Sequence, residues 1–244
     1  MLGRRKSSVR RPGKAKRIAI TFLVFAVLGG AAYAVWFSPM LEIQAVHVEG
    51  ARSTDAGKFE EGVGKNILFW DVPTGSDELP YVANIEVRKD YAERTISVKL
   101  TERDRDIIWC LEKSGECFWA DENGLIFSNA PNPSGPLVIK VVRDHTERGL
   151  TLGDRVLEEE MFLNLEKIFV LLDNTGLSIV EMRIDDLKFK EITATVASGP
   201  ELYFSLLLDP EFGRSVIGSL RESSEWGRIR YVDLRVENRA YYSL

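Results

Sequence analysis

Ile18 to Phe37 reads IAITFLVFAVLGGAAYAVWF, twenty residues without a charged side chain. A helix rises about 1.5 Å per residue, so this segment spans roughly 30 Å, the thickness of the hydrocarbon core of a bilayer. Tyr33 and Trp36 lie near its end, where amphipathic rings favour the membrane interface. The sequence therefore predicts a single transmembrane helix near the N-terminus.

The residues before this helix are basic, and those after it are acidic. Residues 1–37 hold eight of the chain's 32 Lys and Arg side chains and none of its 37 Asp and Glu, which leaves a net charge of −13 on the remainder. Basic residues beside a membrane helix favour the cytoplasm. We therefore interpret 1–17 as a cytoplasmic tail, 18–37 as the membrane helix, and the rest as exported. The acidic remainder argues against binding to nucleic acid, which needs clustered basic residues on the fold.

A cleaved signal peptide is the alternative to a retained anchor. Ala32-Tyr33-Ala34 has the small-x-small form of a signal-peptidase site. Against cleavage, the basic region is long, and the apolar run continues past Ala34 to Phe37. The retained anchor is the favoured interpretation, with the bilayer as a partner.

Residues 41–103 have the pattern of a small α+β module. A strand is predicted to end at Gly50, and Ser53 or Thr54 is expected to cap a short helix. A second short helix is expected from Asp71, before a proline. Two alternating runs on either side of a polar turn then indicate a half-buried hairpin. The predicted order of this module is β-α-α-β-β.

Residues 104–244 are expected to form a β-rich domain with two helices. Strands are predicted at Leu187–Val196 and Leu202–Leu208, and Phe212, Val216 and Leu220 indicate the second helix. The clearest helix is predicted for Asp154–Asn174, where apolar residues recur every three or four positions and indicate a core-facing stripe. Gly176 lies where a helix terminator is expected. The fold class predicted for the whole chain is α+β: a transmembrane helix, a small module and a β-rich domain.

Cys110 and Cys117 are the two cysteines of the chain, and they flank a predicted hairpin turn. They can face each other across two strands, and an oxidising compartment permits a disulfide. The alternative is that they are two independent small apolar side chains. Two cysteines alone do not make a metal site.

Motifs that carry catalysis are missing from the sequence. It contains no phosphate-binding G-x-x-x-x-G-K-[ST], no H-E-x-x-H and no G-x-S-x-G. Its two histidines, His47 and His145, lie in unrelated segments. Asp121–Gly124 resembles part of a calcium loop but lacks the later carboxylate ligands. We therefore expect no enzyme, no catalytic residue, no metal site, no cofactor and no small-molecule substrate.

Five short stretches are informative together. They are IQAVHVEG (43–50), GKNIL (64–68), the hairpin LPYVANIEVRKDYAERTISVKLTER (79–103), WADENGLIF (119–127) and, most specific, YVDLR (231–235). In this order they resemble the FtsQ/DivIB family of bacterial cell-division proteins. The chain departs from the family at Tyr91-Ala92, where an aromatic-proline pair is frequent, and at Asp104, where proline is frequent. Both lie in turns or strand ends, so they leave the expected fold standing and put surface contacts of the first module in doubt.

The resemblance implies a non-enzymatic scaffold of the division machinery in the cytoplasmic membrane, at the septum. Residues 41–103 would be a POTRA domain and residues 104–244 an FtsQ-type β domain. Such a scaffold links early and late division components. Its expected partners are small coiled-coil proteins like FtsB and FtsL, together with other divisome proteins.

The C-terminal segment Arg230–Tyr242 is predicted to be the last strand, with one buried face and no following strand to cover it. Such an edge exposes unpaired N–H and C=O groups, and an extended partner segment can pair with it. The resemblance places the FtsB segment in this region. On this hypothesis Arg235 meets a carboxylate of the partner. The expected partner-binding residues are Leu234, Arg235, Val236, Glu237, Asn238, Arg239, Tyr241 and Tyr242.

Two other classes of protein compete with this interpretation. The first is a membrane-anchored export or assembly factor with a POTRA domain, which has no particular need of the YVDLR ending. The second is a cleaved and secreted hydrolase. Septal localisation would separate the scaffold from the first, and an intact chain in the membrane fraction would exclude the second.

Overall fold

The computed structural model describes residues 14–74, 79–133 and 140–244. Residues 1–13 of the predicted cytoplasmic tail lie outside the described part of the chain. The chain divides into two compact units, and the division passes through two strands of the smaller sheet. The first unit comprises Met1–Gly50, Asp55–Pro73 and Glu86–Lys99, and the second comprises Ala51–Thr54, Thr74–Ile85 and Leu100–Leu244.

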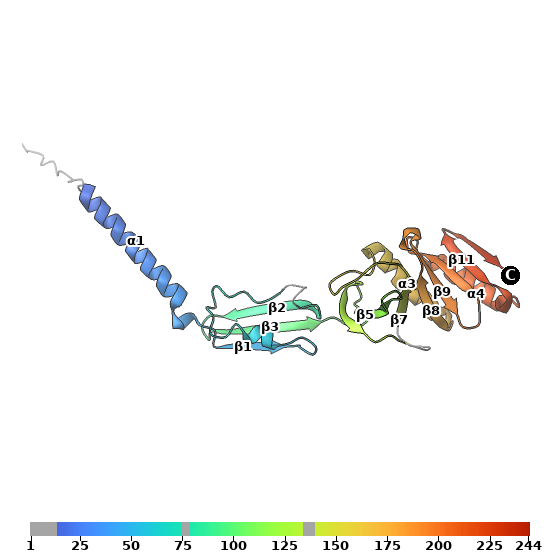
Figure 1. The fold of residues 1–244 in the computed structure, drawn as a ribbon, viewed down its shortest axis with the longest axis horizontal. Coiled ribbons are helices and arrows are strands. Elements are labelled where there is room, and N and C mark those ends of the chain that lie inside the picture. Colours follow the sequence, from blue (N-terminus) through green and yellow to red (C-terminus); the bar gives the residue numbers. More distant parts are fainter. Residues whose placement is uncertain (1–13, 75–78, 134–139) are drawn as a thin grey trace, which may run out of the picture. The chain divides into compact units, whose positions relative to one another are not determined.

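Helix α1 (Lys14–Phe37) contains the predicted apolar segment (Figure 1). Ile18–Phe37 has a mean hydropathy of 2.3, and none of it is buried within the chain. This helix is long and apolar enough to cross a membrane, as predicted. It ends where Pro39 follows Ser38, because the residue before a proline is disfavoured in a helix. Ser38 then caps a 3₁₀ turn (Pro39–Leu41), accepting a hydrogen bond from the Met40 N–H.

The smaller sheet has three strands in the order β1-β3-β2. Its strands are β1 (Ala45–Glu49), β2 (Val82–Asp90) and β3 (Thr95–Glu102). β1 lies parallel to β3, and β2 and β3 form the predicted hairpin (Figure 1). The alternation predicted for β3 is confirmed, because Ile96, Val98 and Leu100 are buried while the residues between them are exposed.

The helices of this module differ from the predicted β-α-α-β-β order. α2 (Gly57–Glu60) is only four residues long, and its N-terminal flank is Ala56. The N–H groups of Ser53 and Thr54 donate at 2.8 Å to one oxygen of the Glu102 carboxylate, so these residues form a loop around an acceptor instead of a helix cap. Asp71–Thr74 is irregular, and residues 75–78 lie outside the described part. The order of the described elements is β-α-β-β.

The larger sheet has nine strands in the order β12-β11-β10-β9-β8-β7-β4-β5-β6. Its strands are β4 (Ile107–Leu111), β5 (Glu116–Ala120), β6 (Ile126–Ala130), β7 (Lys140–Asp144), β8 (Ile179–Ile184), β9 (Glu191–Val196), β10 (Glu201–Ser205), β11 (Tyr231–Val236) and β12 (Arg239–Ser243). The parallel pairs are β4–β7, β7–β8 and β10–β11, and the other neighbours are antiparallel.

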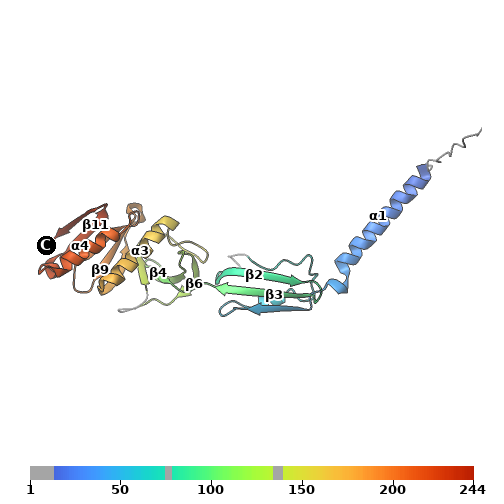
Figure 2. The same cartoon turned by 180° about the vertical axis from the view of Figure 1, so that it is seen from behind.

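Two helices provide crossover connections that parallel neighbours require. α3 (Glu159–Thr175) connects β7 to β8, and α4 (Glu211–Glu222) connects β10 to β11. Both connections run in the same direction along the sheet, so the right-handed rule places both helices on one face, as Figures 1 and 2 show. The main core lies between this face and the helices.

The predicted apolar stripe of the long helix is confirmed. Met161, Leu165, Ile168 and Leu172 lie on α3 and are buried in the main core, and Leu157 is buried in the same core but precedes the helix. The helix begins at Glu159 and not at Asp154, because residues 153–156 bond to the backbone around β6. It ends at Gly176, which adopts the left-handed conformation at φ 62° that glycine tolerates best.

Two strand boundaries in the second half differ from expectation. The predicted strand Leu187–Val196 begins only at Glu191, because Leu187–Phe189 forms a 3₁₀ turn capped by the side chain of Asp186. The predicted strand Leu202–Leu208 ends at Ser205.

Cys110 on β4 and Cys117 on β5 are opposite each other and are joined by a disulfide. With Ile108 they form a small buried cluster, and alternation along β4 places it on the face of the sheet away from α3 and α4. The sequence left open whether these cysteines form a disulfide or are two independent apolar side chains, and the structure contains the disulfide.

Replacing both cysteines by alanine is expected to lower the free energy of unfolding. The bridged residues are 7 apart in the sequence. Closing so short a loop in the unfolded chain corresponds to roughly 2.5 kcal/mol at 25 °C. Urea unfolding of the detergent-solubilised full chain, with and without reductant, measures the effect. Reductant should destabilise the native chain and leave the double variant unchanged, and an equal response of both proteins would contradict the prediction.

Candidate partner-binding edge

The chain ends in a β-hairpin and not in the single strand predicted for Arg230–Tyr242. β11 and β12 are antiparallel, and Glu237 and Asn238 form the turn between them. Asn238 has φ 55°, a left-handed conformation that asparagine accepts more readily than most residues. The turn reverses the chain, so β11 lies between β10 and β12. The expectation that the whole segment is an uncovered strand was therefore wrong, and β12 alone forms the edge.

The backbone N–H and C=O groups of β12 point alternately toward β11 and away from it. The Ser243 carbonyl accepts a hydrogen bond from the Arg230 N–H at 2.8 Å, so Ser243 directs its backbone toward the β11 side. Backbone direction alternates along a strand. The N–H and C=O groups of Ala240 and Tyr242 are therefore directed away from β11. No strand of the described residues lies beyond β12 in the sheet.

Two tyrosines of β12 lie on opposite faces of the sheet. Tyr242 is paired with Val232, which faces the main core, and Tyr241 is paired with Asp233 on the other face. The exposed fractions of Tyr241 and Tyr242 are 51% and 50%. A segment that paired with β12 would therefore meet an aromatic ring on each side.

The opposite edge of the sheet, β6, is partly covered. The Ile126 N–H donates to the Asp154 carbonyl at 2.9 Å, and the Gly153 N–H donates to the Ile126 carbonyl at 2.8 Å. Leu125 and Arg155 form a further isolated bridge beside this strand. Of the two edges of the nine-stranded sheet, β12 is the more open one in the described structure.

Arg235 is engaged within the sheet. Its Nε and Nη2 donate to the Asp233 carboxylate at 2.8 and 2.6 Å, and its Nη1 forms an ion pair with Glu191 on β9. The hydrogen bond from Arg235 holds the pKa of Asp233 below its ordinary value, and the same bond raises the pKa of Arg235. Because these two carboxylates already occupy the guanidinium, its expected contact with a partner carboxylate stays a prediction.

Aromatic rings surround this guanidinium. It lies 5.3 Å from the ring centroid of Tyr203 on β10, and that ring stacks on Tyr231 at a centroid distance of 5.6 Å. The Tyr203 hydroxyl donates to Glu201 at 2.7 Å. Burial and this carboxylate raise the pKa of Tyr203. The cluster holds β9, β10 and β11 together on the face of the sheet that α3 and α4 do not cover.

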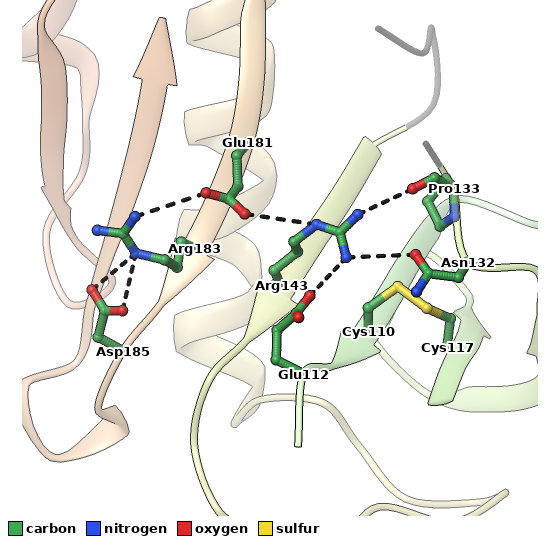
Figure 3. A network of polar contacts seen from close by, with 9 residues as sticks. All are labelled: Cys110, Glu112, Cys117, Asn132, Pro133, Arg143, Glu181, Arg183 and Asp185. Carbon is green, nitrogen blue, oxygen red and sulfur yellow. Dashed lines mark hydrogen bonds and ion pairs between the residues drawn. A yellow bond between two sulfur atoms is a disulfide. The ribbon is translucent and has the colours of Figure 1, made fainter. Parts of the chain in front are cut away.

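A ladder of ion pairs continues across the same face (Figure 3). Arg143 on β7 donates to Glu112 at 2.7 Å and lies 3.6 Å from Glu181 on β8. Arg183 lies 3.8 Å from Glu181 and 2.9 Å from Asp185. Positive and negative side chains alternate along this ladder, so its charges are largely compensated within the chain. The unpaired backbone of β12 is therefore a better candidate for a binding site than this face of the sheet.

The eight predicted partner-binding residues all lie on the terminal hairpin, but they do not share one environment. Leu234 packs on the main core, and Arg235 belongs to the ion cluster. The residues at the surface are Val236, Glu237, Asn238, Arg239, Tyr241 and Tyr242.

Sequence reasoning missed Ala240, Glu191, Tyr203 and Tyr231. Ala240 offers little side chain, so its importance lies in backbone groups whose direction depends on the pairing with β11. Glu191 and Tyr203 are far from the hairpin in the sequence, and only the strand order brings them to Arg235. The alternation of Tyr203 with the buried Leu202 and Phe204 was the available signal.

The described residues show no group of three or more His, Cys, Asp and Glu side chains that could hold a metal ion. No model of a known protein family matches the chain, and no curated protein is significantly similar to it. Function must therefore be inferred from the residues and the geometry of the chain itself.

Proposed function

We propose that this chain is a non-enzymatic, membrane-anchored scaffold of the bacterial division machinery, which binds an extended segment of another protein along β12. One observation carries the proposal: the nine-stranded sheet ends in an edge strand whose outward backbone groups have no partner among the described residues. The likeness of the sequence to the FtsQ/DivIB family supplies the cellular setting, the septum of the cytoplasmic membrane.

In this proposal α1 spans the membrane with the N-terminus in the cytoplasm. Residues 41–103 form a POTRA-type domain and residues 104–244 an FtsQ-type β domain, both outside the cytoplasm. Two features support this topology. α1 is the one described helix apolar enough to cross a membrane, and the Cys110–Cys117 disulfide fits an oxidising compartment.

Binding would occur by strand addition. Main-chain hydrogen bonds to Ala240 and Tyr242 supply affinity, while Tyr241 and Tyr242 contact side chains of the added segment and contribute specificity. An FtsB-type protein is the proposed donor of that segment, and an FtsL-type protein would join the complex with it. Other divisome components would follow, which is how a protein without catalytic residues can act as a scaffold.

Localisation of the intact chain tests the proposal. The tag belongs at the N-terminus, because a C-terminal tag would follow Leu244 directly and lie beside β12. We expect the tagged chain at division septa and expect FtsB- and FtsL-type proteins to co-purify from solubilised membranes. Uniform distribution around the cell envelope, without these partners, would favour the alternative of a membrane-anchored export or assembly factor.

A further inference from the structure

Exposed apolar side chains surround the end of α1. Met40 is 79% exposed, Trp36 is 58% exposed, and Leu68 and Phe69 are about half exposed. All four belong to the same compact unit as α1. Leu68 and Phe69 stand in a loop that follows α2, far from α1 in the sequence, so their position beside the helix is a property of the fold.

Asn66 connects this loop to the last turn of α1 by hydrogen bonds. Its side-chain amide donates to the carbonyl oxygens of Val35 at 2.8 Å and Trp36 at 3.3 Å. These carbonyls have no partner within a helix that ends at Phe37, so the amide satisfies groups that the helix end leaves open. The Ile67 N–H adds a bond to the Leu41 carbonyl at 2.8 Å. Two hydrogen bonds therefore link the loop to the end of α1, and a third links it to the 3₁₀ turn that follows.

The aromatic rings of Trp36 and Phe69 determine how close the loop lies to the membrane interface. Phe69 stacks on Trp36 with their centroids 4.4 Å apart. Trp36 is the next-to-last residue of the apolar segment, where tryptophan favours the interface between hydrocarbon and water. If α1 spans the membrane, Phe69 must lie at the same interface, because the headgroup region is wider than the separation of the two rings.

We infer that Met40, Leu68 and Phe69 insert into the interfacial layer of the outer leaflet, so that a lipid surface is the partner of this patch. The inference rests on the membrane anchoring in the proposed function and adds a second, peripheral contact with the bilayer. Basic side chains border the patch: Lys65 is exposed, and Arg94 donates to the Pro39 carbonyl at 3.3 Å. Cations at this depth are favourable beside anionic lipid headgroups.

The test uses the full chain in vesicles of phosphatidylcholine and phosphatidylglycerol at a low protein-to-lipid ratio. A cysteine introduced by Leu68→Cys carries the environment-sensitive dye NBD, and the native cysteines remain protected in their disulfide when reductant is omitted. Nitroxide-bearing lipids quench dyes that contact the bilayer. The matched control is Lys99→Cys, an exposed position on β3 about 17 Å along the strand from Arg94. Leu28→Cys, within α1, reports whether the helix is inserted.

We expect nitroxides near the headgroups to quench the dye at position 68 several-fold more strongly than the dye at position 99. Phe69→Cys should give the same result as Leu68→Cys. Quenching at position 28 without quenching at 68 or 69 would overturn the inference and leave the anchor intact. Absence of quenching at position 28 would refute the anchor itself and the inference with it. A dye at 68 that is shielded from water but not quenched, and only at high protein density, would mean that a second copy covers the patch, which also overturns the inference.

Discussion

Replacement of Asp144 by alanine is expected to destabilise the chain by about 3–5 kcal/mol, because it removes a fully buried carboxylate and leaves the partly buried Arg148 guanidinium without its counter-charge. The Asp144 side chain is fully buried beneath the helices at the end of β7. It accepts hydrogen bonds from the Trp109 ring at 3.0 Å, from the Thr146 N–H at 2.9 Å, and from Arg148 Nε at 2.7 Å. The Arg148 guanidinium also lies 5.4 Å from the centroid of the Trp109 ring. The Asp144 carboxylate thus connects β7 to the loop that follows it and to the ring of Trp109 on β4.

Urea unfolding of the detergent-solubilised full chain measures the loss. Asp144→Asn preserves the shape of the side chain and removes its charge, so it should lose less stability than Asp144→Ala. Asp185→Ala is the matched control, since Asp185 pairs with Arg183 at an exposed position where an ion pair contributes only about 0–1 kcal/mol. Equal effects at positions 144 and 185 would show that the buried cluster is not a special source of stability.

The Asp144 cluster also predicts a dependence on pH. Burial alone would raise the pKa of Asp144, but hydrogen bonds from Thr146 and Trp109 and the charge of Arg148 outweigh it and lower the pKa. A lowered folded-state pKa stabilises the fold above the unfolded-state value, about 3.9, and this contribution is lost as the pH falls through the folded-state pKa. The stability difference between the native chain and Asp144→Asn should therefore be full at neutral pH and shrink below about pH 4. A difference that grew on acidification would contradict the assignment.

Local periodicity explains which elements could be predicted from the sequence. The uncharged run Ile18–Phe37, the stripe of the helix that ends at Gly176 and the alternation of β3 depend only on neighbours a few residues away. Each therefore left a signal in a short window. The periodicity of β8 is a weaker signal, because Val180 is 64% exposed while Met182 and Ile184 are buried. Part of the pairing of β8 is with β7, which lies before α3 in the chain. Sequence reasoning missed β8, although Val180, Met182 and Ile184 alternate with polar residues and β9, its other partner, follows it directly in the chain.

The sequence predicted which segment forms the candidate site, but it did not predict how that segment folds. The sequence of Arg230–Tyr242 indicates extended structure with one buried face, and it contains Glu237-Asn238 without an obvious glycine to mark a turn. The pairing of β11 with β12 and the positive φ of Asn238 show that the segment folds back on itself. For the same reason Arg235 looked available, whereas Glu191, 44 residues away, already pairs with it. Which strand forms an edge depends on the order of the whole sheet.

Replacement of Ala240 by proline is expected to weaken binding of the extracytoplasmic segment of an FtsB-type protein by about 5- to 150-fold. Proline removes the outward N–H of Ala240, so a buried carbonyl of the added segment would lose its donor, at a cost of about 1–3 kcal/mol. Edge strands tolerate proline where the N–H faces solvent. The variant should therefore fold normally, and urea unfolding checks that. The double variant Ala240→Pro/Tyr242→Pro removes both outward donors and should abolish measurable binding.

The matched controls separate the backbone from the side chains. Ala240→Thr alters the side chain but keeps the N–H, and threonine suits a strand, so this variant should bind almost as well as the native chain. Tyr241→Pro should instead destabilise the hairpin, because the backbone of Tyr241 is directed toward β11. Fluorescence anisotropy of the labelled partner segment, with the full chain held in nanodiscs, gives the dissociation constants. If Ala240→Pro and Ala240→Thr bound equally well, the partner would not add to β12 through main-chain hydrogen bonds. The uncovered edge would then have to be explained without strand addition.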